Sequence, residues 1–211
     1  MCRSTRFTLD GVGVMRARAG VRAVVALTAL ATVALTGCSG GKNAVDQSAN
    51  TEFRYVQANK QGTLIAPDKR KLAGPLNGTL LSGGNYQLSA DRGKVVVLNF
   101  FASWCGPCQN ETPQFDTVYR QRKASGVQFV GLDVKDPSKS ASQAWLQNKQ
   151  VTFPVVYDEP GKTALQLGDL PLAGLPATVV VDRQGRVSAV YVGEVLPKDL
   201  TNALDQLAKE A

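Results

Sequence analysis

Residues 99–113 read Asn99-Phe100-Phe101-Ala102-Ser103-Trp104-Cys105-Gly106-Pro107-Cys108-Gln109-Asn110-Glu111-Thr112-Pro113. This is the pattern of a buried strand's end, a short turn with two cysteines and the first turns of a helix. Two thiols separated by two residues can close a small disulfide ring, and the N–H groups and dipole at a helix start stabilise a thiolate. The stretch therefore indicates thiol-disulfide exchange, although a Cys-x-x-Cys pair is also half of a zinc site.

The composition removes several other chemistries. The chain has no histidine, which excludes Ser-His-Asp triads, Cys-His nucleophile pairs and histidine metal sites. The four cysteines are Cys2, Cys38, Cys105 and Cys108, and only three remain if residues 1–37 are removed. Three thiols cannot build a disulfide framework, and one Cys-x-x-Cys pair cannot by itself complete a tetrahedral zinc site. We therefore expect no metal site.

The charge of the chain is concentrated at its start. The formal net charge is +7, but residues 1–37 hold five arginines and one aspartate. The remainder has 19 basic and 16 acidic residues, a net charge of +3. Because no basic cluster with interleaved aromatic residues is present, we expect no nucleic-acid partner. The length of 211 residues suits one domain of ordinary size with additional segments.

The N-terminal 37 residues have the pattern of a secretory signal peptide. Arginines precede an apolar run at 23–36, which is shorter than the ~20 residues of a membrane-spanning helix. Leu35-Thr36-Gly37-Cys38 resembles a bacterial lipobox, in which Cys38 would be lipidated and become the new N-terminus. An uncleaved signal anchor is the alternative, and Met15 is a second candidate start. Simple secretion is a further alternative. Each reading places the domain outside the cytoplasm, where no glutathione pool keeps thiols reduced, and lipidation of Cys38 would hold it stably on the membrane.

The next segment is polar and poor in branched apolar residues. Residues 38–61 therefore read as a lipidated, flexible tether that would let the domain range some tens of ångströms from its anchor, at about 5–6 Å times the square root of its length. The sequence thus divides into a signal peptide at 1–37, the tether, and a folded domain at 62–211.

Strand and helix patterns alternate within that domain. Near-continuous apolar runs at 94–101 and 127–134 predict strands buried on both faces. Further predicted elements are helices at 104–123, 138–149, 163–167 and 199–210, strands at 153–157, 176–181 and 187–192, and an N-terminal hairpin of 80–81 and 86–88. This order predicts an α/β fold with a mixed central sheet and helices on both faces.

Two stretches carry a resemblance to a known family. Trp104-Cys105-Gly106-Pro107-Cys108 with Pro113 five residues later, and Gly174-Leu175-Pro176-Ala177-Thr178, resemble the thioredoxin superfamily. Within it, the chain is similar to the membrane-tethered TlpA/ResA/DsbE-like thiol-disulfide oxidoreductases. The resemblance covers about residues 62–211 and implies a thioredoxin-like fold with an extra helix inserted within 137–168.

The resemblance implies a role for each cysteine. Cys105 is expected to be exposed at the helix N-terminus as the attacking thiolate of low pKa. Cys108, one turn further in, should be shielded and should resolve the mixed disulfide with the substrate. Pro107 suits a first-turn position because it lacks an N–H, and with Gly106 it tunes how well the helix stabilises the thiolate. No cofactor beyond the redox-active Cys105–Cys108 disulfide is expected.

The sequence departs from the thioredoxin pattern at two positions, one on each side of the cysteines. Where thioredoxin has a buried aspartate, this chain has Asn99, which cannot carry a proton to and from Cys108. The TlpA/ResA-like proteins place an acid in the helix instead, three residues past the second cysteine, which here is Glu111. Positions i and i+3 share a helix face, so a partly buried Glu111 could take the proton. The alternative is an exposed glutamate that only stabilises the first helical turn.

The opposite wall of the site is expected from Pro176. In the cis form it would match the family's cis-proline loop, lie against the cysteines, block metal capture and expose the Leu175 backbone for strand-like pairing with a peptide. An ordinary loop proline is the alternative. We expect Trp104 at the rim of the site and Trp145 in the core of the inserted helix.

These features predict a tethered dithiol oxidoreductase that reduces protein disulfides in partners such as apocytochrome c. The resemblance implies a membrane reductant of the DsbD/CcdA kind. The shared motif favours reduction, since thioredoxin has a potential of about −270 mV against about −120 mV for DsbA. An oxidase of secreted proteins would use the same residues.

Two other functions are alternatives. A peroxidase of a related fold is disfavoured, because this chain has Ser103-Trp104-Cys105 where a peroxidase needs a Thr-x-x-Cys site. The alternative of another class is a non-catalytic lipoprotein that serves as a binding or metallochaperone module.

Overall fold

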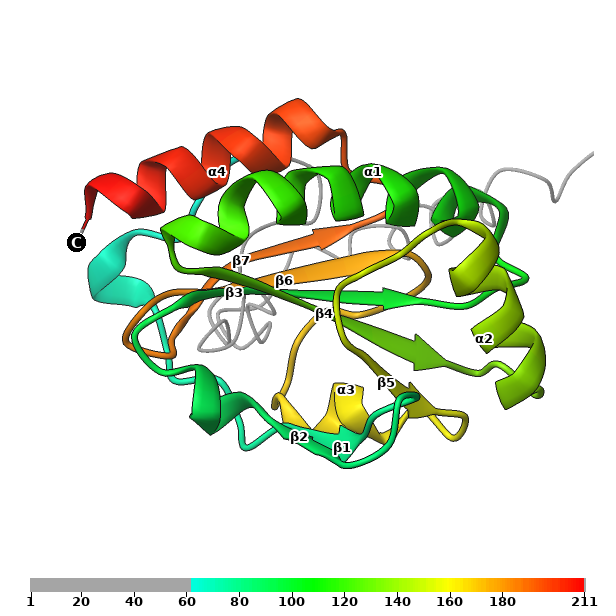
Figure 1. Ribbon diagram of the computed structural model, residues 1–211. Helices are drawn as coiled ribbons and strands as arrows, with labels where there is room; N and C mark the ends of the chain where they lie inside the picture. Colours follow the sequence, from blue (N-terminus) through cyan, green and yellow to red (C-terminus); the bar gives the residue numbers. More distant parts are fainter. Residues whose placement is uncertain (1–61, 211) are drawn as a thin grey trace, which may run out of the picture. The chain divides into compact units, whose positions relative to one another are not determined.

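The central sheet has five strands in the order β5-β4-β3-β6-β7 (Figure 1). This computed structural model describes residues 62–210, so the predicted signal peptide, the lipidated Cys38 and the tether lie outside the described residues. The strands are β3 (Val95–Phe101), β4 (Val127–Val134), β5 (Val155–Asp158), β6 (Ala177–Val181) and β7 (Val187–Val192). The first three are parallel, and β6 is antiparallel to both β3 and β7. The predicted mixed sheet is confirmed.

The middle strand β3 separates two apolar layers. All seven of its residues are buried, as expected for a strand covered on both faces. Its side chains alternate, so that one set joins one layer (Val95, Val97 and Phe101) and the other set joins the second (Val96, Leu98 and Phe100). Because β3 runs into the cysteine turn, this double burial fixes where the turn begins.

Helices cover the two faces unequally. The helices α1 (Gly106–Arg122), α2 (Lys139–Asn148) and α4 (Pro197–Lys209) pack against the first layer, with α1 and α4 side by side in Figure 1. The other face carries the short α3 (Lys162–Gln166) and an N-terminal hairpin. Three 3-10 turns complete the described chain, η1 (Pro67–Lys69), η2 (Leu88–Asp91) and η3 (Lys123–Ser125).

The N-terminal hairpin exists, but its predicted first strand is wrong. Its strands are β1 (Asn77–Thr79) and β2 (Asn85–Gln87). Residues 80–81 instead run along the edge of β5, where Leu81 N donates to Val155 O at 2.8 Å. Gly78 lies so close to that strand that a Cβ would come within 2.4 Å of Val156 Cγ1. Packing rather than β-propensity therefore selects β1, since Asn and Gly are poor strand formers.

The chain before the hairpin covers the opposite edge of the sheet. Ile65 N donates to Ser188 O at 2.7 Å, and Val187 N donates to Lys71 O at 2.8 Å. Both edge strands, β5 and β7, therefore have neighbouring chain along at least part of their length.

A buried arginine ties this first segment to the end of the domain. The Arg70 side chain is 1% exposed and pairs with Glu210 at 2.5 Å and with Asp182 at 3.3 Å. Its Nε donates to Ile65 O at 2.9 Å. Asp182 is also paired with Arg186 at 2.8 Å. The network joins the first described turn, the β6–β7 connection and the end of α4.

Candidate active site

The two cysteines form a disulfide at the junction of β3 and α1. The S–S distance is 2.00 Å, and Cys105 is the N-cap of α1, its Sγ accepting a hydrogen bond from Cys108 N at 3.3 Å. Gly106 and Pro107 occupy the first helical turn, where a proline leaves no N–H without a partner. The start of the helix dipole thus points at the first sulfur, as a stabilised thiolate requires.

The two cysteines differ less in exposure than expected. Cys105 is 6% exposed and Cys108 is 0% exposed, so the prediction of an exposed Cys105 is wrong for the disulfide form. In this form the Cys105 sulfur is bonded to the sulfur of Cys108, which is fully buried. The exposed residue is its neighbour Trp104, at 59%, whose Nε1 donates to Lys135 O at 3.0 Å.

Glu111 is buried in α1, three residues after Cys108. It is 1% exposed, so the alternative of an exposed, helix-stabilising glutamate is wrong. Its Oε1 accepts from Val195 N at 2.7 Å, and its Oε2 accepts from Asn99 Nδ2 at 2.7 Å. Burial raises the pKa of Glu111 to about 7, against the lowering effect of these two hydrogen bonds, while the charge of Glu194 raises it further. Both protonation states are thus accessible near neutral pH, as a proton acceptor needs.

Asn99 holds this carboxyl from the neighbouring strand. Its Nδ2 also lies 3.4 Å from Thr178 Oγ1, just beyond Pro176. Its Oδ1 is buried and has no hydrogen-bond partner among residues 62–210. A protonated Glu111 carries an O–H donor, and a flip of the amide would present Oδ1 to it. An amide at this position therefore suits both protonation states of Glu111.

The loop before β6 forms the opposite wall. The Leu175–Pro176 peptide bond is cis, Pro176 is buried, and Leu175 is half-buried against both apolar layers. This loop and the cysteine turn line one pocket of ≈ 610 Å³. Its lining residues are Phe100, Trp104, Cys105, Gly106, Pro107, Val134, Lys135, Gly161, Ala164, Leu172, Ala173, Gly174, Leu175 and Ala177. The sequence prediction named several of these residues but did not foresee the pocket.

The loop after β4 supports the cysteine turn, and sequence reasoning missed it. Asp136 is 2% exposed, and its Oδ2 accepts from Ser103 N at 2.9 Å. With the bond from Trp104 to Lys135, this loop holds both residues that precede Cys105. A signal was available, because Asp136 follows a parallel strand, and the carboxyl ends of parallel strands meet at one edge of a sheet.

A second buried acid, Asp133, joins β4 to the inserted helix. It is 0% exposed, its Oδ2 accepts from Ser142 Oγ at 2.5 Å, and burial raises its pKa to about 6. On the same helix Trp145 packs against Phe101 with ring centroids 5.7 Å apart. Trp145 thus lies against the core, as predicted.

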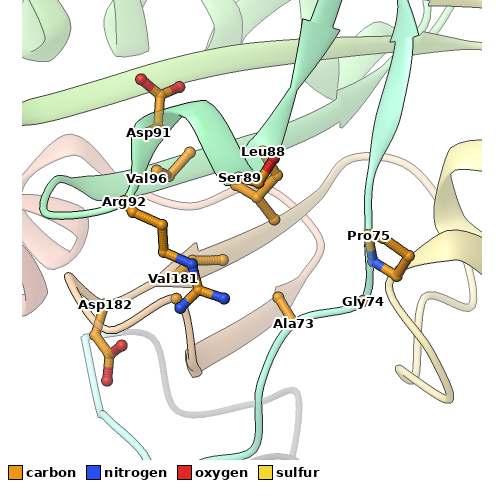
Figure 2. Close-up of a pocket in the computed structure, with 11 residues that line it drawn as sticks. Ala73, Gly74, Pro75, Leu88, Ser89, Asp91, Arg92, Val96, Val181 and Asp182 are labelled. Carbon is orange, nitrogen blue, oxygen red and sulfur yellow. The ribbon is translucent and has the colours of Figure 1, made fainter.

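Another hollow, of ≈ 200 Å³, lies at the far end of the sheet, around Val96 and Val181 (Figure 2). Its acids are already paired, Asp91 with Lys94 at 2.9 Å and Asp182 with two arginines. Arg92 extends across it and donates to Gln184 O. None of the predicted site residues lines it, so we assign the chemistry to the cysteine end. Within residues 62–210 no group of three or more Cys, Asp or Glu side chains could hold a metal ion.

The fold and the dithiol turn define a thioredoxin-like thiol-disulfide oxidoreductase. A family model described as Redoxin matches residues 60–207. The thiol-disulfide oxidoreductase ResA of Geobacillus kaustophilus is 31% identical over 129 residues, which are 61% of this chain and 72% of the relative. The thioredoxin-like protein YneN of Bacillus subtilis is 31% identical over 59% of this chain and 72% of its own length.

Solved structures agree with this class. A DsbF homologue from Corynebacterium diphtheriae superposes with a TM-score of 0.67 at 32% identity, over 72% of this chain and 96% of that one. A secreted thiol-disulfide isomerase from Corynebacterium glutamicum gives 0.68 at 28% identity, over 74% and 96%. The chain belongs to the Redoxin family and, within the thioredoxin superfamily, to the TlpA/ResA/DsbE-like thiol-disulfide oxidoreductases.

Proposed function

We propose that this protein is a membrane-tethered, extracytoplasmic oxidoreductase that reduces disulfides in protein partners through Cys105 and Cys108. The observation that carries the proposal is the buried Glu111 of α1, three residues after Cys108, which is held by Asn99 and Val195 and has a pKa of about 7. Such a carboxyl can accept and return a proton near neutral pH.

The reaction proceeds in two exchanges. The Cys105 thiolate attacks one sulfur of the substrate disulfide, forming a Cys105–substrate disulfide and releasing the other substrate sulfur as a thiolate. Glu111 takes the Cys108 proton, and the Cys108 thiolate attacks Cys105, which closes the Cys105–Cys108 disulfide and releases the second substrate thiol. Two electrons pass to the substrate, and an external dithiol later restores the enzyme.

Substrate contact is assigned to the loop opposite the cysteines. The Leu175 main chain makes no hydrogen bond with any other residue in 62–210, and the residue lines the same pocket as Cys105. Its N–H and C=O are therefore free to pair with an extended peptide, the usual way that a strand-like segment is bound. Pro176, which follows Leu175 through the cis peptide bond, is buried. Trp104, Gly106 and Pro107 shape the cysteine side.

The sequence and the relatives support the location and the partners that we propose. The signal pattern of 1–37 and Cys38 in a lipobox support a lipid anchor, and the similar protein from C. glutamicum is described as secreted. None of the helices within 62–210 is long and apolar enough to span a bilayer. The substrate that we propose is apocytochrome c, and the electron donor that we propose is a membrane protein of the DsbD/CcdA kind, as the resemblance to the TlpA/ResA/DsbE-like proteins implies.

The second candidate is the reverse reaction, disulfide formation in secreted proteins. It would start from the Cys105–Cys108 disulfide, the form of the dithiol that the structure contains. The reduction potential of the Cys105–Cys108 pair and its redox state in cells separate the two. A potential near that of thioredoxin, about −270 mV, with a mostly reduced pair supports the reductant, and a potential near about −120 mV with a mostly oxidised pair supports the oxidase.

The decisive experiment traps the partner. A Cys108→Ser variant cannot resolve the mixed disulfide, so it should accumulate a covalent adduct with its natural substrate, which mass spectrometry identifies. A Cys105→Ser variant is the matched control and should trap nothing. An absence of adduct with Cys108→Ser, alongside full function of Cys105→Ser in cells, would reject the exchange mechanism.

Glu111→Gln tests the proton acceptor separately. Since glutamine cannot take a proton, the Cys108 pKa should change and the resolving step should slow by about 10²-fold or more. Unchanged thiol pKa values and exchange rates would assign Glu111 a purely structural role.

A further inference from the structure

We propose that the pocket beside Cys105 selects peptides that carry an acidic side chain close to the reacting cysteine, and that Lys135 is the cation that recognises it. This inference rests on the proposed function, because it names the class of substrate for the same site. It assigns a specificity role to a residue outside the Cys-x-x-Cys and cis-proline stretches.

The pocket is apolar except at one point. Of its 14 lining residues, all within the described chain, Lys135 is the sole charged side chain, and the others are apolar residues or glycine. A volume of ≈ 610 Å³ is in the range of pockets that hold small ligands. The apolar walls suit an apolar side chain of a bound peptide, and the ammonium group suits a neighbouring carboxylate.

The backbone holds Lys135 at this place in an unfavourable conformation. Its φ is 60°, in the left-handed region that glycine adopts at much lower cost than lysine. Lys135 N donates to Glu159 O at 3.1 Å, and its carbonyl accepts from the Trp104 indole. Residues in such conformations gather at ligand and active sites. Lys135 therefore occupies a position that favours glycine and accepts a hydrogen bond from Trp104, the residue before Cys105. We take this as a sign that the lysine side chain has a function at the site.

The charge of Lys135 is available to a partner. Its side chain passes beside Gly161, where an added Cβ would lie 3.2 Å from Lys135 Cε and 3.9 Å from Nζ. Gly161 lines the same pocket, so the lysine stem crosses its wall. None of the ion pairs found within residues 62–210 involves Lys135. An acidic peptide side chain is therefore the complementary occupant.

The test uses two synthetic peptides, each with a disulfide and an apolar residue beside one cysteine, that differ only by Glu or Gln on the other side. The reduced full-length protein should act on the Glu peptide with a kcat/KM about two- to fivefold higher, the range of an exposed ion pair. The preference should shrink as salt rises from 0.05 to about 0.5 M. Equal rates for the two peptides at low salt would overturn the inference while leaving the proposed function intact.

Variants locate the preference. Lys135→Gln should bring the Glu/Gln rate ratio close to one, and Lys135→Arg should retain it. Lys198→Gln, which removes an exposed lysine of α4 outside the pocket, should keep the wild-type ratio. A ratio that survives Lys135→Gln would overturn the assignment to Lys135. Failure to reduce either peptide would overturn the proposed reductive function and this inference with it.

Discussion

The carboxyl group of Glu111 is titratable, and the fold buries it away from water. A carboxyl with 1% exposure needs donors, and Val195 and Asn99 supply one to each oxygen. Burial nevertheless dominates and raises its pKa from 4.5 to about 7. The same residue that would move a proton in catalysis therefore makes folding depend on pH.

The pH dependence has a definite sign. Between pH 4.5 and about 7 the folded form keeps a proton on Glu111 that the unfolded chain has lost, so the free energy of unfolding should fall as pH rises through this window. The loss should level off above it, after at most about 3 kcal/mol. Urea unfolding of the oxidised protein from pH 4 to 8 measures this.

Because glutamine does not titrate, Glu111→Gln should remove the slope between about pH 6 and 7 and about half of the slope below pH 6. Asp133, whose pKa is raised from 3.8 to about 6, should leave a slope of comparable size below that pH. Glu159→Gln, a change at an exposed position, should leave the slope as in the wild type. A slope that persists in full in Glu111→Gln would contradict the assignment.

Two residues other than glycine have left-handed backbone angles, Lys135 with φ 60° and Gln150 with φ 55°, among the described residues. Replacing either by glycine should relieve that cost and raise the free energy of unfolding by about 0.5–1 kcal/mol. Chemical denaturation at neutral pH compares the two. A gain at Gln150 with a loss at Lys135 would show that the lysine side chain itself contributes contacts to the folded state.

At the residue scale, sequence reasoning worked where the information is local. The dithiol and Glu111 lie within one stretch of chain, so spacing alone predicted a shared helix face. Asp136 was missed because its contact with Ser103 depends on β4 lying beside β3. The exposure of Cys105 was wrong because it depends on how the ring closes, which no local pattern reports.

At the scale of elements, the strands that the sequence predicted best are those with both faces buried. The runs that became β3 and β4 were found within one residue, because an apolar run of that length has few alternatives. The strand β1 was missed because Asn77-Gly78-Thr79 has no apolar pattern and pairs through contacts with β2 and β5. Elements fixed by tertiary packing are the ones that pattern analysis loses.

The close approach of β1 to β5 makes a prediction for Gly78. Gly78→Ala would place its Cβ 2.4 Å from Val156 Cγ1, so the hairpin must shift, and we expect a loss of about 1–3 kcal/mol in unfolding free energy. Thr79→Ala, at the exposed neighbouring position, should change it by less than about 0.5 kcal/mol. Equal effects of the two changes in urea titrations would contradict the packing argument.

At the scale of the whole described domain, Arg70 connects its two ends. The guanidinium is 1% exposed, and it bonds both Asp182 and Glu210. Arg70→Met would leave buried Asp182 with only Arg186, so the free energy of unfolding should fall by about 3 kcal/mol. Lys69→Met, next in sequence, removes only an exposed pair and should cost less than about 0.5 kcal/mol. A small effect of Arg70→Met in the same unfolding assay would mean that water replaces the lost partner.

The fold class of the domain was predictable from the sequence, but the contacts that join its distant segments were not. The alternation of strand and helix patterns predicted the mixed sheet, and the two motifs predicted the family. The Arg70 network joins residues 112 and 140 positions apart in the chain, and the pocket draws its walls from four separate segments. Long-range juxtapositions of this kind have no signature in a single sequence.

The covered edges of the sheet bear on whether the protein can aggregate with its substrate chains. The substrates that we propose are protein chains, and a protein chain that has not yet folded offers unpaired strands. An open edge strand would template such chains and seed fibrous aggregates. Here Leu81 lies along β5, and the segment of Ile65 and Lys71 lies along β7. Both sheet edges are thus partly covered against growth by strand addition, while the main chain of the Leu175 loop, where we propose that a substrate peptide pairs, stays uncovered.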